Sequence, residues 1–229
     1  MKTIGLIGGM SWESTVTYYS IINSRINAEL GKNHSAQCIV YSFDFQNIEE
    51  LQYAGKWAEL EVELIKAAKA LKAAGADFLV ICTNTVHKVA DNIEKEVGLP
   101  LLHIADVVGE AVQTDGRQRI GLLGTIFTME EDFYVRRLES KFGLHVLVPE
   151  KNDRQVINNI IFSELVKGIV KERSKNEYLR IMDILKNQGA EGIVLGCTEI
   201  GLLIKEYDLP LYDSAVLHAN KAATMSLIP

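Results

Sequence analysis

The stretch GADFLVICTNT (residues 75–85) recurs in the second half of the chain as GAEGIVLGCTE (residues 189–199). When the two segments are superposed, Thr83 falls on Cys197. This repetition predicts a duplicated half-molecule. Two similar halves that face each other across a cleft would present Thr83 and Cys197 to opposite sides of a small substrate.

The repeat extends upstream, because IGLIGG at 4–9 and IGLLGT at 120–125 match at nearly the same offset. Short, almost continuously apolar runs alternate with amphipathic segments, a pattern typical of buried parallel strands joined by helices. We therefore predict an α/β protein of two similar domains, each a parallel sheet flanked by helices, related by a pseudo-two-fold axis. The expected strands span residues 3–8, 37–43, 78–82, 99–103, 119–123, 145–148, 192–196 and 209–212.

Helices are predicted at 57–74 and 176–188, and each is followed by a glycine, Gly75 or Gly189, where a helix commonly ends. A last helix at 215–227 has no strand after it, and we expect it to pack back on the first domain. The chain then crosses between domains near Pro100 and Pro210, so that residues 1–99 and 211–229 form the first domain and residues 100–210 the second.

The composition of the chain indicates which kinds of molecule it binds. At 229 residues with 48% apolar content, the chain is long enough to bury a sizeable core. Its 30 acidic and 24 basic residues give a net charge of −6 without a basic face, which argues against a nucleic-acid partner. The sequence begins MKTIGLIGG, with no signal-type segment and no apolar run near the ~18 residues of a membrane span. We expect a cytoplasmic protein that acts on a small molecule and does not bind membranes.

The three cysteines, Cys38, Cys82 and Cys197, are too few and too scattered for a disulfide framework. None lies in a CxxC motif or pairs with a nearby histidine at zinc spacing, so we expect no metal site. Cys38 lies in a strand-like run and is interpreted as a small buried apolar residue.

Four polar motifs follow predicted strands, and in parallel sheets the ligand lies beyond the carboxyl ends of the strands. They are GGMSWEST (8–15), CTNT (82–85), GT (124–125) and GCTE (196–199). In the first, glycines allow close approach of backbone to a ligand and Ser11 is placed to cap the next helix, although a purely structural tight turn is also open. It lacks the GxGxxG fingerprint of dinucleotide-binding proteins. Together the four motifs, at corresponding points of two half-repeats, predict a binding site for a small polar substrate.

The pairing of TNTVH (83–87) with GCTEI (196–200), behind IGLIGGMSWEST, resembles the aspartate/glutamate racemase superfamily. The resemblance runs from Lys2 to the last helix and is greatest to the aspartate racemase and broad-specificity amino-acid racemase branch. It implies two domains of like fold with the active site between them, no cofactor, and commonly a homodimer. It also implies two cysteines that remove and return the α-proton of an amino acid from opposite faces.

The chain departs from that pattern at the first cysteine. The family motif has a cysteine directly before the asparagine, whereas here Thr83 precedes Asn84 and the cysteine, Cys82, comes one residue earlier. The internal repeat also assigns Thr83 to the site. Cys82 should turn away from the cleft, since neighbouring side chains on a strand point to opposite faces, although a bulge would bring Cys82 into the site instead.

This exchange has a chemical consequence. A thiol is readily ionised by nearby dipoles, whereas a threonine hydroxyl has no comparable route to the alkoxide, so Thr83 is a poor general base. Its hydroxyl, or a water bound to it, still supplies a proton once a carbanion has formed. The resemblance implies that Cys197 works on the L-enantiomer, and we therefore expect a bias toward L-amino acids.

Further roles follow from the resemblance alone. It implies that substrate amino and carboxylate groups are held by Met10 (through its backbone), Asn84, Thr85, Thr125 and Thr198, with Gln52 and Lys167 near the distal carboxylate. Separately, Glu199 lies beside Cys197 in the sequence, and we expect it to poise the protonation of that thiol. A solvated helix residue is the alternative interpretation of Lys167. His87 is open to a structural or a catalytic interpretation.

Two other classes of function stay open. Superfamily relatives that isomerise maleate or racemise hydantoins or homoserine use the same arrangement of reactive groups on two sides of the substrate. A non-catalytic amino-acid-binding protein is the second alternative, because the first cysteine of the motif is missing here.

Overall fold

The computed structural model describes residues 1–228, in which strands and helices alternate along the chain. The strands are β1 (Ile4–Gly8), β2 (Cys38–Ser42), β3 (Phe78–Ile81), β4 (Leu101–Leu102), β5 (Arg119–Gly124), β6 (His145–Leu147), β7 (Gly192–Gly196) and β8 (Leu211–Asp213). The α-helices are α1 (Trp12–Leu30), α2 (Phe45–Tyr53), α3 (Trp57–Ala73), α4 (Ala90–Val97), α5 (Ile104–Thr114), α6 (Ile126–Glu130), α7 (Asp132–Phe142), α8 (Lys151–Ser163), α9 (Glu172–Asn187), α10 (Ile200–Leu203) and α11 (Ser214–Leu227). Two 3₁₀ turns are η1 (Thr85–Val89) and η2 (Leu165–Lys167). Every strand predicted from the sequence is present, with slightly different bounds.

The strands form two four-stranded sheets with the orders β2-β1-β3-β4 and β6-β5-β7-β8. All pairings are parallel. The same order occurs twice, so the predicted α/β fold with two similar halves is confirmed. In each sheet the strand order reverses between the central pair, β1 with β3 and β5 with β7, which is where ligands bind in open parallel sheets.

The chain divides into two compact units, Met1–His103 with His218–Pro229, and Ile104–Leu217. These limits lie a few residues beyond the boundaries expected near Pro100 and Pro210. The difference arises because β4 pairs with β3 and β8 pairs with β7, so each short strand stays with its own sheet.

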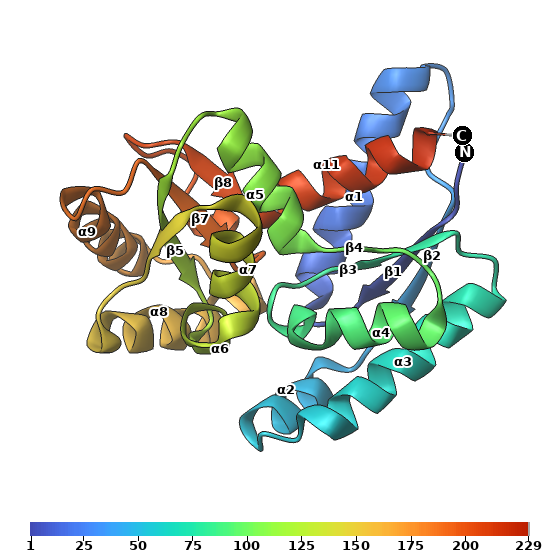
Figure 1. The fold of residues 1–229 in the computed structure, drawn as a ribbon, viewed down its shortest axis with the longest axis horizontal. Helices are drawn as coiled ribbons and strands as arrows, with labels where there is room; N and C mark the ends of the chain where they lie inside the picture. The colour runs from blue at the N-terminus through green and yellow to red at the C-terminus, as the bar shows by residue number, and fades with distance from the viewer. Residues whose placement is uncertain (229) are drawn as a thin grey trace. The chain divides into compact units, whose positions relative to one another are not determined.

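Helices cover both faces of the first sheet (Figure 1). One apolar cluster lies under α2, α3 and α4 and includes Ile7, Leu64, Leu79 and Ile81. On the other face, α1 and α11 run beside the sheet. The Tyr18 hydroxyl lies 2.8 Å from His218 Nδ1, which links α1 to α11. From His218 onward, the last helix belongs to the first unit.

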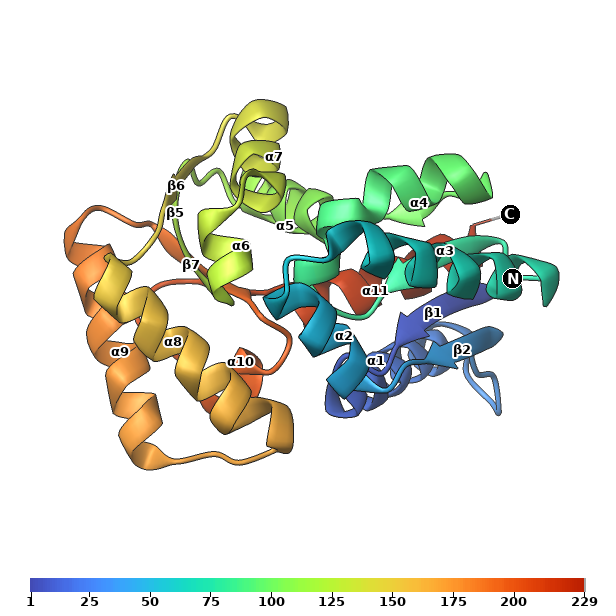
Figure 2. The same ribbon diagram turned by 90° about the horizontal axis from the view of Figure 1, so that it is seen from below.

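The second sheet is also covered on both faces, by α8 and α9 on one side and by α5 and α7 on the other (Figure 2). Successive residues of β7 point to opposite faces, as in any strand. Ile193 and Leu195 belong to the cluster under α8 and α9, whereas Val194 belongs to the cluster under α5 and α7. Both faces of this sheet are thus apolar cores.

Two helix ends lead directly into the central strands β3 and β7. Gly75 follows α3 with a φ of 98°, and Gly189 follows α9 with a φ of 95°. L-residues with a side chain rarely adopt such angles, so glycine lets each helix stop and the chain turn into the sheet. This is the helix end that the repeated GA dipeptide predicts.

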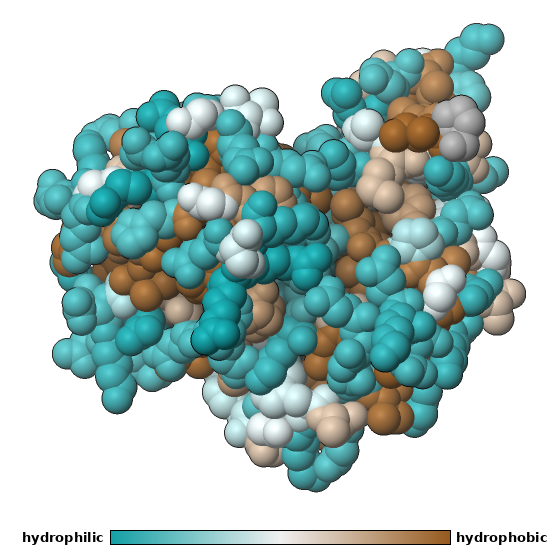
Figure 3. Space-filling view, in the orientation of Figure 1, coloured by the Kyte–Doolittle hydropathy of each residue, from teal (hydrophilic) through white to brown (hydrophobic). Residues whose placement is uncertain are grey.

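The edge strand β2 differs from the expectation of strands buried on both faces. Val40 and Tyr41 are exposed, and Cys38 is half-buried rather than fully buried. Figure 3 shows that the visible surface is mainly hydrophilic, with scattered apolar patches. Among the described residues, no helix combines the length and the apolarity needed to cross a membrane.

Candidate active site

In the first unit, the loops after β1 and β3 are tied together at the carboxyl ends of these strands. Ser11 caps α1, where its side chain accepts a hydrogen bond from the Ser14 backbone N–H at 3.4 Å. The Ser14 hydroxyl donates to the Cys82 carbonyl oxygen at 2.9 Å. A Cβ on Gly9 would collide with the backbone of Phe43, so close chain packing alone requires glycine there. The loop carrying Met10 is therefore held next to the one carrying Thr83.

The alternation of side chains along a strand places Thr83 and Cys82 on opposite faces of the sheet. Leu79 and Ile81 point into the cluster under α2, α3 and α4, and Thr83 follows them at the same two-residue spacing. Thr83 is half-buried, whereas Cys82 is 1% exposed. Burial, together with nearby Cys38, raises the pKa of the Cys82 thiol well above its ordinary value. Such a thiol is an inert core group and not a reactive one.

Replacement of Cys82 by alanine should leave turnover within a few-fold of the wild-type value. The loss of one buried sulfur should lower the free energy of unfolding by about 1–2 kcal/mol. Chemical denaturation and steady-state assays of the purified variant measure the two effects. A complete loss of activity in a folded Cys82→Ala protein would place this thiol, and not Thr83, at the reacting centre.

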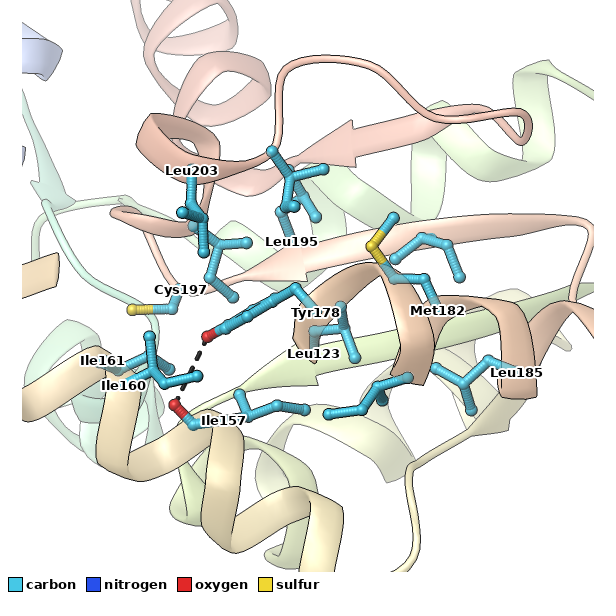
Figure 4. Packing of buried hydrophobic residues seen from close by; sticks show 14 of the residues in the cluster. Leu123, Ile157, Ile160, Ile161, Tyr178, Met182, Leu185, Leu195, Cys197 and Leu203 are labelled. Carbon is cyan, nitrogen blue, oxygen red and sulfur yellow. Dashed lines mark hydrogen bonds between the residues drawn. The ribbon is translucent and has the colours of Figure 1, made fainter. Parts of the chain in front are cut away.

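In the second unit, Cys197 directly follows β7 and has the same parity as Ile193 and Leu195. It occupies in its sheet the position that Thr83 occupies in the first, one residue beyond the counterpart of Cys82, which is Gly196. Cys197 is 8% exposed, and Figure 4 shows it at the edge of an apolar cluster, near Ile161. The duplication thus places a thiol and a hydroxyl at corresponding strand ends.

Glu199 contacts the Cys197 thiol. The Cys197 Sγ donates to Glu199 Oε2 at 3.1 Å, and the Thr198 hydroxyl donates to the same oxygen at 2.7 Å. Burial raises the pKa of Cys197 well above its ordinary value, and the negative charge of Glu199 raises it further. The resting thiol is therefore protonated, and a carboxylate oxygen capable of receiving its proton lies within hydrogen-bonding distance.

The other residues predicted for the site fall into two groups, one in each unit. Those near β1 and β3 are all buried: Met10, Asn84, Thr85 and Gln52, the last on α2. In the second unit, Thr125 is the N-cap of α6 and accepts from the Thr128 backbone N–H at 3.3 Å, while Thr198 and Glu199 adjoin Cys197. Lys167 lies exposed at the end of η2, which packs against α10.

Two groups near Cys197 were missed from the sequence. Asp213 ends β8, beside β7, and its charge also raises the pKa of the Cys197 thiol. Tyr178 is fully buried beneath Cys197, and its hydroxyl donates to the Ile157 carbonyl at 3.4 Å. A search for polar residues directly after predicted strands would have found Asp213, because it follows a predicted strand of the same sheet. Tyr178 carries no such signal, because it lies mid-helix on an apolar face.

Within residues 1–228, no cluster of three or more His, Cys, Asp or Glu side chains has an arrangement that could hold a metal ion. The side chains at the two strand ends carry a thiol, a carboxylate, hydroxyls and an amide. These groups transfer protons and bind small polar molecules.

Comparisons with known proteins agree with this arrangement. A crystal structure assigned to the Asp/Glu racemases, from Yersinia pestis, is 49% identical with a TM-score of 0.93, and the match covers 100% of both chains. An aspartate racemase homologue from Pyrococcus horikoshii OT3 is 38% identical with a TM-score of 0.83, over 99% of each chain. The glutamate racemase of Aquifex pyrophilus is 27% identical over 71% of this chain, and the match spans 62% of that enzyme's length.

The model of the family described as "Asp/Glu/Hydantoin racemase" matches residues 7–222, which include both strand-end motifs and nearly all of both sheets. The match includes Thr83, where the family resemblance leads one to expect a cysteine, and Cys197. Sequence and fold therefore lead to the same result: the chain belongs to the Asp/Glu/hydantoin racemase family.

Proposed function

We propose that the protein is a cofactor-independent racemase of aspartate and glutamate that is biased toward the L-enantiomers. The observation that carries the proposal is the Cys197 thiol, 3.1 Å from the Glu199 carboxylate at the carboxyl end of β7. Family membership supports racemase chemistry in general. The bias follows from the presence of Thr83 at the position that corresponds to Cys197.

The proposed reaction has two proton transfers. The Cys197 thiolate removes the α-proton of the L-amino acid, so that an S–H bond forms while the Cα–H bond breaks and its electron pair passes into the substrate carboxylate. The electron pair then returns from the carboxylate to Cα and forms a new Cα–H bond on the opposite face, with a proton from the Thr83 hydroxyl or from a water bound to it. Solvent replaces the proton that this side gives up, and the Cys197 thiol releases the proton that it gained, so both groups return to their starting states. Backbone N–H and side-chain donors at the strand ends stabilise the negative charge on the carboxylate.

Glu199 has two opposing effects on the first step. It accepts the hydrogen bond of the Cys197 thiol and is positioned to take the proton when the thiolate forms. Its negative charge also raises the pKa of the thiol, which makes the thiolate scarcer but more basic. A more basic thiolate is the better acceptor for a weakly acidic α-proton.

Replacement of Glu199 by glutamine should move the pH dependence of L-substrate turnover toward lower pH. Because Glu199 raises the pKa of Cys197, its neutral isostere lets the thiolate form at a lower pH. The measurements are kcat/KM against pH and the ultraviolet absorbance of the thiolate in the free protein, with Cys197→Ser as the blank. A thiolate titration that stays in place or moves to higher pH in Glu199→Gln would contradict the coupling.

The choice of aspartate and glutamate rests on the family resemblance together with Gln52 and Lys167 as candidates for the distal carboxylate. A panel of L-aspartate, L-glutamate, L-homoserine, a 5-substituted hydantoin and maleate tests it directly. Turnover of the two acidic amino acids above the others supports the proposal. Exclusive turnover of a hydantoin or of maleate assigns the protein to another branch, and binding of amino acids without turnover identifies a binding protein.

A further inference from the structure

His87 is a buried histidine whose ring lies next to Thr83. It belongs to η1 and is 2% exposed. Its Nδ1 lies 2.8 Å from the Thr83 carbonyl oxygen. Its Nε2 is buried and has no hydrogen-bond partner among the described residues. The Thr83 carbonyl is thus a hydrogen-bond partner of the ring, and the Asn84 and Leu102 backbone groups also lie close enough to affect its pKa.

The hydrogen bond fixes the tautomer of His87. Burial, and then the neighbouring His103 ring at 4.7 Å between centroids, lower the pKa of His87 well below its ordinary value. The imidazole is therefore neutral and carries one hydrogen. A carbonyl oxygen only accepts, so this hydrogen must lie on Nδ1, and Nε2 is bare.

A second buried histidine provides a matched comparison. The His218 ring lies 5.7 Å from that of His87 between centroids, and His218 is also fully buried. Its Nε2 is 2.9 Å from the Leu102 carbonyl oxygen, and its Nδ1 is 2.8 Å from the Tyr18 hydroxyl. By the same reasoning, His218 carries its hydrogen on Nε2 and accepts from Tyr18 at Nδ1. Its two ring nitrogens thus contact Leu102 and Tyr18 and not Thr83.

We propose that His87 is a positioning residue for the reaction, acting through Thr83. The last sheet hydrogen bond along this strand runs from the Cys82 N–H to the Ile7 carbonyl oxygen at 2.9 Å, so Thr83 lies beyond the ladder. The His87 Nδ1–H holds the Thr83 carbonyl there and so sets the direction of the Thr83 hydroxyl. An apolar side chain would fill the same space without the cost of burying an imidazole nitrogen that lacks a partner. The inference rests on the proposed racemase function.

Two substitutions at position 87 separate positioning from packing. His87→Leu removes the donor and keeps an apolar side chain in the core. His87→Asn places an amide N–H close to where the imidazole Nδ1–H lies and preserves a donor for Thr83. His218→Leu is the control, since it removes an equally buried imidazole that does not bond to Thr83. Each variant is first checked for folding by circular dichroism and thermal denaturation.

The readout is α-proton exchange in D₂O, with each enantiomer assayed separately. His87→Leu should lower the D-substrate rate roughly 10- to 100-fold, chiefly in kcat, because a displaced acid–base group is costly. The L-substrate rate, which begins at Cys197, should change less. His87→Asn should recover most of the loss, and His218→Leu should keep the wild-type ratio of D to L rates. An unchanged ratio in folded His87→Leu, or an equal shift in His218→Leu, would overturn the inference.

A measurement on the wild-type protein needs neither a variant nor activity. Long-range ¹H–¹⁵N correlation spectra should show His87 as the Nδ1–H tautomer and His218 as the Nε2–H tautomer. An Nε2–H tautomer or a doubly protonated ring at His87 would refute the Thr83 hydrogen bond. If neither enantiomer exchanged in the wild-type protein while these tautomers were found, the racemase function would fail and the hydrogen bond would stand.

Discussion

Replacement of Cys197 by alanine should abolish exchange of the α-proton of L-aspartate and L-glutamate. The variant loses the thiolate that the proposed mechanism uses as its base, and no thiol remains beside Glu199 to replace it. A positioned acid–base group contributes roughly 10²–10⁴-fold to a rate, so the loss should be at least about 100-fold. Exchange followed by proton NMR in D₂O measures it.

The Cys197 variant needs a control for folding, because the side chain is 8% exposed and belongs to the apolar cluster of its unit. Cys197→Ser keeps nearly the same shape and a hydroxyl that can donate to Glu199 but offers no thiolate, so it should be equally inactive. Near wild-type racemisation by folded Cys197→Ala would refute the mechanism.

Replacement of Thr83 by cysteine should increase exchange of the D-enantiomers by about ten-fold or more. A thiol at this strand end supplies a base for the D-face that a hydroxyl cannot supply, and the expected gain is a part of the roughly 10²–10⁴-fold that such a group contributes. The L-enantiomers, which react first with Cys197, should be affected less. Thr83→Ser is the matched control, since it keeps a hydroxyl and should keep the wild-type bias.

The equilibrium ratio of free enantiomers is one for any variant, so initial rates must be compared. D-aspartate and D-glutamate are each assayed in D₂O with Thr83→Cys and Thr83→Ser. Unchanged D-exchange in a folded Thr83→Cys protein that still acts on the L-forms would exclude position 83 as the second acid–base site.

The sequence predicts the sheets well because its strongest signals are local. Short apolar runs ending in glycine, threonine or cysteine mark each central strand and the polar groups that follow it. The repeat alone assigns Thr83 to the position of Cys197, and the structure gives both residues the same parity beyond β3 and β7. Register of this kind is set by the two-residue period of a strand, which a sequence displays directly.

The features that the sequence does not predict depend on packing between segments that are distant in the sequence. The contact of Tyr18 with His218 joins helices near the two ends of the chain, and no periodic pattern in the sequence predicts it. The neutral states of His87 and His218 likewise arise from burial among groups brought together by the fold. Domain limits also differ slightly from the prolines, because the pairing of two very short strands decides them.

We propose above all that the protein removes the α-proton of an acidic L-amino acid and returns a proton to the other face. The most direct measurement incubates the wild-type protein with L-aspartate or L-glutamate in D₂O, without pyridoxal phosphate. The α-proton signal is followed by NMR, and the enantiomers are separated by chiral chromatography. We predict loss of the α-proton signal together with appearance of the D-enantiomer, and neither change with Cys197→Ala. Persistence of the α-proton signal with both amino acids, in a protein shown by calorimetry to bind them, would contradict the account.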